Sequence, residues 1–154
     1  MKVFLKQNQI TAEAYYRLDQ NQIHNLAVLV LDVNSRKVLS YVGNAPTTAE
    51  HANYVDIVTR ERSTGSTLKP FLFASLLSAG ELLPNSLVAD VPTSINGYSP
   101  QNFDRSYHGA VPASEALARS LNVPAVNLLR EYGLKRFYNN LHQLNFKSID
   151  KAAD

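Results

Sequence analysis

The chain has 154 residues, of which 45% are hydrophobic and 18% are charged, so it carries enough apolar material for a globular core and is not a disordered tail. Its 15 basic and 13 acidic residues leave a net charge of +2 without a lysine or arginine run, which argues against nucleic-acid binding. The lack of cysteine excludes disulfides, thiolate metal sites and a cysteine nucleophile.

The first part of the chain predicts a linker followed by a β-hairpin. Residues 1–24 are polar and rich in glutamine and asparagine, and we expect a lead-in segment without a function of its own. Leu26–Asp32 is an apolar run too short for a helix, the turn residues Asn34-Ser35 follow it, and apolar character resumes over Lys37–Val42. We expect the first strand to be buried on both faces. Because Leu26–Leu31 is far shorter than the roughly 20 residues of a membrane helix, no membrane segment is expected.

A hydroxyl and an amine stand close together where a polar segment meets an apolar one. Ser66 and Lys69 are three residues apart, so helical spacing places both side chains on one face, near enough for the amine to take the hydroxyl proton. Gly65 removes side-chain bulk before the serine, Thr67 helps to shape the turn, and unpaired N–H groups of the first helical turn would stabilise an oxyanion. Since Ser148–Lys151 has the same spacing without a preceding glycine, context must distinguish the two copies.

The remaining elements are mostly helical. Thr67–Ala79 is apolar around most of its circumference, which predicts a helix inside a core that ends at Gly80. Leu83–Tyr107 contains three prolines and predicts a long irregular connection. Three further helices are then expected: Glu115–Arg119 with Ser114 as its cap, a helix from Pro124 at its first position to Tyr132, and a last one over Leu134–Leu144.

Ser120 and Asn122 lie on a tight connection between two predicted helices, where they could face the serine and lysine of the earlier turn. Ser94–Asn96 repeats this spacing without flanking helices. In their context, Gly65–Phe71, Tyr98–Asp104 and Ala116–Val126 resemble three segments of the transpeptidase domain of class A penicillin-binding proteins, especially the 1C type.

This resemblance covers roughly residues 26–146 and implies a fold. We expect an α/β (α+β) arrangement, a partial serine β-lactamase or D,D-transpeptidase-like fold in which an N-terminal β-hairpin precedes a helical subdomain. Residues 25–154 would be the N-terminal portion of the transpeptidase domain. The family's Lys-Thr-Gly motif occurs nowhere in the sequence, and the family places it on a strand beyond residue 154. We therefore expect weak or no penicillin labelling of these residues alone, and an uncovered sheet edge that favours a homodimer.

The resemblance also implies a function. A D,D-transpeptidase cross-links peptidoglycan stem peptides ending in D-Ala-D-Ala through an acyl-serine intermediate, is acylated by β-lactam antibiotics, and needs no cofactor or metal. Its place is the periplasmic face of the bacterial inner membrane. The matching positions imply a nucleophile, a base, a proton relay and substrate-binding groups. The implied catalytic residues are Ser66, Lys69 and Ser120, and the implied substrate-binding residues are Asn122, Gly65 and Thr67.

Simpler interpretations stay open for each of these residues. Ser66 and Asn122 are both good helix caps, and most lysines lie at the surface with the amine in water. At the level of function, the alternatives are a non-catalytic or sensor-like penicillin-binding module and a serine β-lactamase-like hydrolase. The four histidines show no metal-ligand spacing.

Overall fold

The computed structural model describes residues 22–44, 49–146 and 149, in two units that divide between Arg62 and Ser63. Residues 1–21 of the predicted lead-in segment lie outside the described residues, as does most of the second Ser-x-x-Lys copy at Ser148–Lys151. Among the described residues, no helix is both long and apolar enough to cross a membrane.

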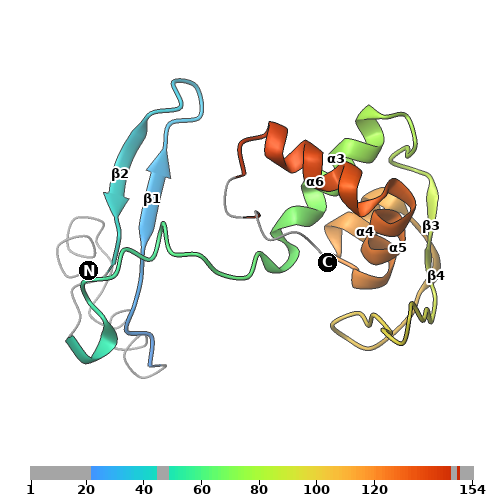
Figure 1. Cartoon of the computed structure of the whole chain (residues 1–154), viewed down its shortest axis with the longest axis horizontal. Helices are drawn as coiled ribbons and strands as arrows, with labels where there is room; N and C mark the ends of the chain where they lie inside the picture. Colours follow the sequence, from blue (N-terminus) through green and yellow to red (C-terminus); the bar gives the residue numbers. More distant parts are fainter. Residues whose placement is uncertain (1–21, 45–48, 147–148, 150–154) are drawn as a thin grey trace. The chain divides into compact units, whose positions relative to one another are not determined.

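The first unit contains the predicted hairpin, which is confirmed. Strand β1 (Val28–Leu31) pairs antiparallel with β2 (Val38–Val42), and η1 (Ala49–His51), a single 3₁₀ turn, comes later in this unit (Figure 1). The side chain of Asp32 accepts hydrogen bonds from the backbone N–H, at 2.7 Å, and the hydroxyl of Ser35, which tightens the turn between the strands.

The prediction that the first strand is buried on both faces is wrong. The successive residues Val30 and Leu31 point to opposite faces of the ribbon, yet they are 41% and 52% exposed. Each strand has one neighbouring strand in this two-stranded sheet, which by itself buries little side-chain area.

The second unit begins with a 3₁₀ turn, η2 (Gly65–Leu68), that runs directly into helix α3 (Lys69–Ser78). The predicted interior helix is thus shorter, and it is buried along one side only. Leu72 and Leu76 are each 3% exposed, whereas Leu77 is 42% exposed. An apolar composition around the whole helix therefore overestimated its burial.

Helix α3 ends as predicted. Gly80 has a φ of 72°, in the left-handed region that glycine adopts without strain. Its N–H bonds to the carbonyl of Leu77 at 3.1 Å, and that of Glu81 to Leu76 at 3.0 Å, which are the two bonds of a Schellman motif.

Two short strands were missed within and after the predicted irregular connection. Strand β3 (Leu87–Asp90) pairs antiparallel with β4 (Gly109–Pro112), placing Leu87 opposite Pro112 and Asp90 opposite Gly109. The loop that joins them includes a small turn closed by a bridge between Ile95 and Tyr98, and the second Ser-x-Asn copy, Ser94–Asn96, runs into this turn. Four-residue strands separated by a proline-rich loop leave no sustained period in the sequence.

Three helices complete the unit: α4 (Ala113–Ala118), α5 (Asn122–Tyr132) and α6 (Leu134–Gln143). The last prediction is correct to within one residue, but two helix starts are wrong. Pro112 precedes α4, so Ser114 lies inside the helix rather than capping it. Helix α5 begins two residues earlier than predicted, which makes Pro124 its third residue.

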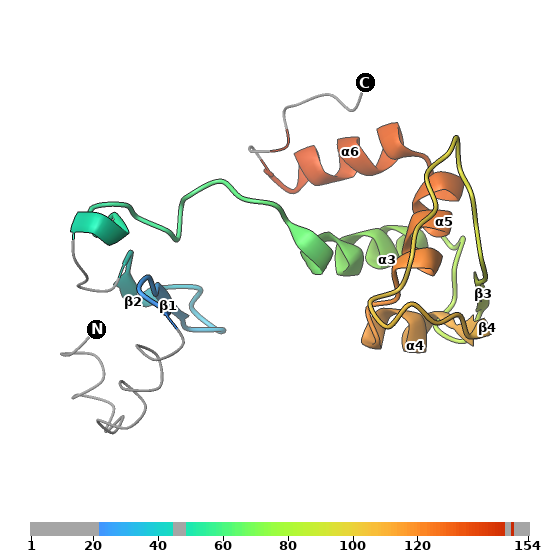
Figure 2. The same cartoon turned by 90° about the horizontal axis from the view of Figure 1, so that it is seen from below.

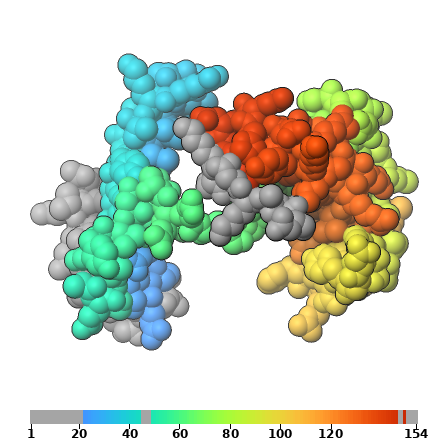
Figure 3. Space-filling view, in the orientation of Figure 1, coloured from blue at the N-terminus to red at the C-terminus, as the bar shows by residue number. Residues whose placement is uncertain are grey.

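Helix α5 lies at the centre of this unit and contacts α3, α4, α6 and β3 (Figures 1 and 2). The space-filling view shows α6 and α5, in red and orange, packed side by side above the yellow loop that precedes β4 (Figure 3). One apolar core joins these elements. Its buried residues include Leu72, Phe73, Leu76, Val88, Val111, Ala116, Leu121, Leu128, Tyr132, Phe137 and Leu141.

Candidate active site

The turn that precedes α3 is shaped by Gly65 and Thr67. Gly65 has a φ of 52°, and a Cβ built on it would meet no atom within 4 Å. Glycine is thus required here for its backbone conformation, and the predicted need to remove side-chain bulk is not supported. The hydroxyl of Thr67 donates to the carbonyl of Thr64 at 2.6 Å, and its backbone N–H donates to the same oxygen at 3.1 Å.

Ser66 and Lys69 belong to one 3₁₀ turn. The backbone N–H of Lys69 donates to the carbonyl of Ser66, and residues three apart eclipse one another in this conformation. Ser66 is exposed, and its hydroxyl forms no hydrogen bond with any residue that the structure describes. It does not cap α3, because Leu68 takes that position without a side-chain bond. The N–H groups of Thr67 and Lys69 are engaged in the turn, so these two are not free oxyanion donors.

The side chain of Lys69 reaches across to the connection between α4 and α5. Its Nζ lies 2.6 Å from the carbonyl oxygen of Ser120, 3.2 Å from the Ser120 hydroxyl and 2.6 Å from Oδ1 of Asn122. Three of the predicted site residues thus form one cluster across more than fifty residues of sequence. The same contacts exclude the interpretation of Lys69 as a lysine extended into solvent.

Backbone conformation aims Ser120 at the amine. Ser120 has a φ of 53° and follows the last turn of α4. Its N–H bonds to the carbonyl of Leu117 and that of Leu121 to Ala116, both at 2.9 Å, in a second Schellman motif. Serine thus occupies a left-handed position that glycine usually fills, and such strain in a non-glycine residue often accompanies function.

Asn122 is the first residue of α5 and not its cap, so the capping interpretation is wrong. Its Oδ1 accepts from Lys69, and its Nδ2 donates to the carbonyl of Gln101 at 2.9 Å. The cap comes instead from Asn102, whose Oδ1 accepts from the backbone N–H groups of Asn122 at 2.8 Å and of Val123 at 3.3 Å.

Burial lowers the pKa of the Lys69 amine from its ordinary value of 10.5, because the charged form loses hydration. The three oxygens around Nζ act in the opposite direction, since hydrogen bonds to an ammonium stabilise it. Lys69 therefore holds the cluster together as a donor and is also shifted toward the neutral form that a base requires.

Sequence reasoning did not find the contribution of Asn102. The sequence assigns no role to Gln101–Asp104, and nothing in the composition of this segment shows that one asparagine would cap a helix twenty residues away. The need for a distant acceptor follows only from the observed helix start, because α5 begins at Asn122 directly after Leu121, whose side chain cannot accept a hydrogen bond. No group of three or more potential metal ligands gathers among the described residues.

Comparison with known proteins gives a consistent result. The family model of the penicillin binding protein transpeptidase domain matches residues 26–153. Penicillin-binding protein 1C of Escherichia coli (strain K12) is 42% identical over 121 residues, which cover 78% of this chain and 16% of that protein. Penicillin-binding protein 1B of the same strain is 38% identical over 116 residues, covering 70% and 14%. The chain thus spans less than a fifth of the length of these relatives.

Solved structures agree. Penicillin-binding protein 1A from Haemophilus influenzae aligns with a TM-score of 0.71 and 26% identity over 84% of this chain and 20% of that one. The penicillin-binding protein PonA1 from Mycobacterium tuberculosis aligns with a TM-score of 0.65 and 26% identity, covering 76% and 30%. These similarities confirm the predicted partial transpeptidase-like fold, which combines helices and strands. The chain therefore belongs to the penicillin-binding protein transpeptidase domain family.

Proposed function

We propose that this chain forms part of a D,D-transpeptidase that cross-links peptidoglycan stem peptides through an acyl-enzyme on Ser66. The observation that carries the proposal is the meeting of Lys69 Nζ with Ser120 and Asn122, because it joins the Ser-x-x-Lys turn to the Ser-x-Asn connection. The periplasmic side of a bacterial membrane, where stem peptides are found, is the corresponding location.

The reaction has two halves. Ser66 Oγ attacks the carbonyl carbon of the penultimate D-Ala while Lys69 takes its proton, and the terminal D-Ala leaves as an amine that must itself receive a proton. The amine of a second stem peptide then attacks the acyl-serine, forms the cross-link and restores the hydroxyl. A β-lactam would enter the first half in the same way, since its strained amide replaces the D-Ala-D-Ala bond.

Counting protons supports the role of Ser120. A neutral amine has two N–H donors and one lone pair, while two of the three oxygens near Lys69 Nζ, the Ser120 carbonyl and Asn122 Oδ1, can only accept. The lone pair therefore stays available to the Ser66 hydroxyl. Once Lys69 has taken that proton, the third N–H of its ammonium can be donated to the Ser120 hydroxyl oxygen, whose own hydrogen is then free to be donated onward. Ser120 is thereby suited to pass a proton from Lys69 to the leaving D-Ala amine.

Asn122 is suited to hold substrate. Its Nδ2 carries two hydrogens, and one of them goes to the carbonyl of Gln101. The second is left for a carbonyl oxygen of the stem peptide. Gly65 and Thr67 contribute by fixing the turn that presents Ser66, rather than through contacts of their own.

Release of D-Ala tests the proposed function. The complete product of the gene that encodes this chain is incubated with a stem pentapeptide ending in D-Ala-D-Ala and with an acceptor amine. The expected result is release of D-Ala together with a new amide, both blocked by benzylpenicillin. Release without amide formation would indicate a hydrolase, and the absence of release would indicate a non-catalytic penicillin-binding module.

Ser120→Gly is expected to slow acylation by a fluorescent penicillin by about 100-fold without lowering the melting temperature. Glycine adopts the left-handed conformation of this position without strain and keeps the carbonyl that binds Lys69, so only the hydroxyl is lost. Asn145→Gly is the matched control. Asn145 has a φ of 65° at the end of α6, and its replacement should leave acylation unchanged. If the Ser120→Gly variant is acylated at the wild-type rate, Ser120 is not the proton relay.

We also infer self-association of this chain as a homodimer through the β1–β2 hairpin. Leu31 and Leu39 are more than half exposed on this hairpin, and among the residues that the structure describes no third strand pairs with its outer edges. Light scattering of the 154-residue chain should give twice the mass of 17.1 kDa. A monodisperse monomer at the same concentration would contradict this prediction.

A further inference from the structure

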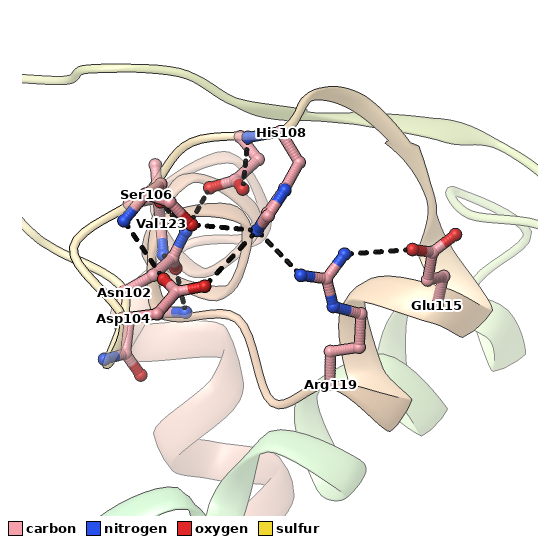
Figure 4. A network of polar contacts seen from close by, with 9 residues as sticks. Asn102, Asp104, Ser106, His108, Glu115, Arg119 and Val123 are labelled. Carbon is pink, nitrogen blue, oxygen red and sulfur yellow. Dashed lines mark hydrogen bonds and ion pairs between the residues drawn. The ribbon is translucent and has the colours of Figure 1, made fainter.

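Two buried polar side chains outside the Lys69 cluster connect β3 to the start of α5, and one of them, Asn102, is labelled beside Val123 in Figure 4. Asp90, the last residue of β3, is 0% exposed, and Asn102, in the loop before β4, is 4% exposed. Nδ2 of Asn102 donates to Oδ1 of Asp90 at 2.7 Å and to the carbonyl of Ser106 at 2.8 Å. The second oxygen of Asp90 accepts the backbone N–H of His108 at 3.0 Å.

The hydrogen-bonding capacity of Asn102 is fully used. Both hydrogens of its Nδ2 are donated, and its Oδ1 accepts from the first two N–H groups of α5, those of Asn122 and Val123. If the amide of Asn102 were turned over, its NH₂ group would face the two backbone N–H groups of α5, and its oxygen would face the Asp90 carboxyl and the Ser106 carbonyl. The orientation of Asn102 is therefore fixed by its surroundings, chiefly by Asp90.

The same loop holds Asn122 at a second point. The carbonyl of Gln101, the neighbour of Asn102, accepts from Asn122 Nδ2 at 2.9 Å. One loop thus determines where the backbone of Asn122 begins the helix and which way its amide turns. Since Asn122 Oδ1 lies 2.6 Å from Lys69 Nζ, the loop also determines where the amine can rest.

We propose that Asn102, locked by the buried carboxyl of Asp90, is a positioning residue that orients Asn122 and through it the Lys69 amine. The proposal rests on the proposed function for its kinetic consequence. It adds two residues from a different part of the chain, which touch neither the serine nor the amine themselves.

Asp90 also reaches the other side of the Lys69 cluster. The ring of His108, whose backbone Asp90 holds, meets the guanidinium of Arg119 at 2.7 Å between Nε2 and Nη2 (Figure 4). Arg119 precedes Ser120 and is itself held by Glu115 at 3.1 Å. Because arginine can only donate, His108 Nε2 is the acceptor of this bond. The buried carboxyl of Asp90 therefore supports both Ser120 and Asn122 through their neighbours.

Asn102→Ala is the first test, performed on the complete gene product. This variant loses the side-chain cap of α5 and the contact with Asp90, so Asn122 and the Lys69 amine are expected to shift. Because a misplacement of about 1 Å can slow a reaction about 100-fold, penicillin acylation is expected to slow by about this factor. The matched control is Asn140→Ala, because Asn140 Nδ2 donates at 2.6 Å to the hydroxyl of Tyr132 at the far end of α5. The Asn140→Ala variant loses an amide contact with the same helix and should be acylated at the wild-type rate. Equal acylation rates for the two variants would overturn the proposal.

The second test exchanges the two side chains, Asn102→Asp and Asp90→Asn, and measures whether the acylation rate recovers. Asn102→Asp keeps the cap but sets a second carboxylate against Asp90, so acylation should fall as in the alanine variant. Adding Asp90→Asn restores one donor between the two positions and is expected to regain about tenfold. If Asn102→Ala does not fold, the double variant decides. Acylation no faster than that of Asn102→Asp, or failure of the double variant to fold, would overturn the proposal.

The outcomes separate this proposal from the proposed function. If the wild-type protein forms no penicillin adduct, or forms one that survives replacement of Ser66, the transpeptidase assignment itself fails. If the adduct depends on Ser66 but its rate is insensitive to Asn102, the positioning proposal alone fails.

Discussion

Ser66→Ala is expected to abolish covalent labelling by a fluorescent penicillin, a loss of at least about 10⁴-fold in the acylation rate. Only the nucleophilic oxygen is removed, because the Ser66 hydroxyl is exposed and bonds to none of the residues that the structure describes. The melting temperature should therefore remain that of the wild type. The measurement is the rate of adduct formation on the complete gene product, followed by gel fluorescence.

The control for this variant is Ser78→Ala, which removes an exposed hydroxyl from the other end of α3. It should be labelled at the wild-type rate. Labelling of the Ser66→Ala variant at a comparable rate would show that another residue is the nucleophile, and the proposed chemistry would have to be abandoned.

Lys69→Arg should reduce acylation by about 10³-fold or more, although it keeps a cation with several donors at this position. Arginine can still bond to the Ser120 carbonyl and to Asn122 Oδ1, but it cannot lose a proton and so cannot act as the base. Lys69→Met should be equally slow and less stable, because it removes the donor that these two oxygens share. Acylation of the Lys69→Arg variant at the wild-type rate would contradict the role of Lys69 as the base.

The pH dependence follows from the lowered pKa of Lys69. Acylation should rise with pH as the amine loses its proton and level off below pH 10.5, the ordinary pKa of lysine. The unfolded chain, in which the pKa is not lowered, binds more protons between the two pKa values. This residue therefore makes stability rise with pH across that interval. The pH dependence should be absent from the residual rate of Lys69→Met.

Local signals in the sequence predicted the elements that depend on local chemistry. The turn residues Asn34-Ser35 lie between the hairpin strands, and the positive φ of Gly80 ends α3. The spacing of Ser66 and Lys69 predicted that both lie in one turn. The predicted junction of two helices places Ser120 after α4 and Asn122 at the start of α5, and both contact the Lys69 amine.

Properties that depend on distant partners were not predictable. Leu77 is as apolar as Leu76, yet only the latter is buried, because other helices cover one side of α3. The cap of α5 comes from Asn102, which no local motif connects to that helix. Two four-residue strands were hidden for a related reason, since β3 and β4 depend on pairing with each other across a long loop.

The most direct test of the account is to locate the penicillin adduct in the chain. Cleavage after Arg62 gives a peptide that begins at Ser63, and fragmentation in a mass spectrometer can assign the added mass to one residue. A stoichiometric adduct on Ser66 is expected in the complete gene product. An adduct on any other residue, or a protein that remains unmodified at saturating penicillin, would contradict it.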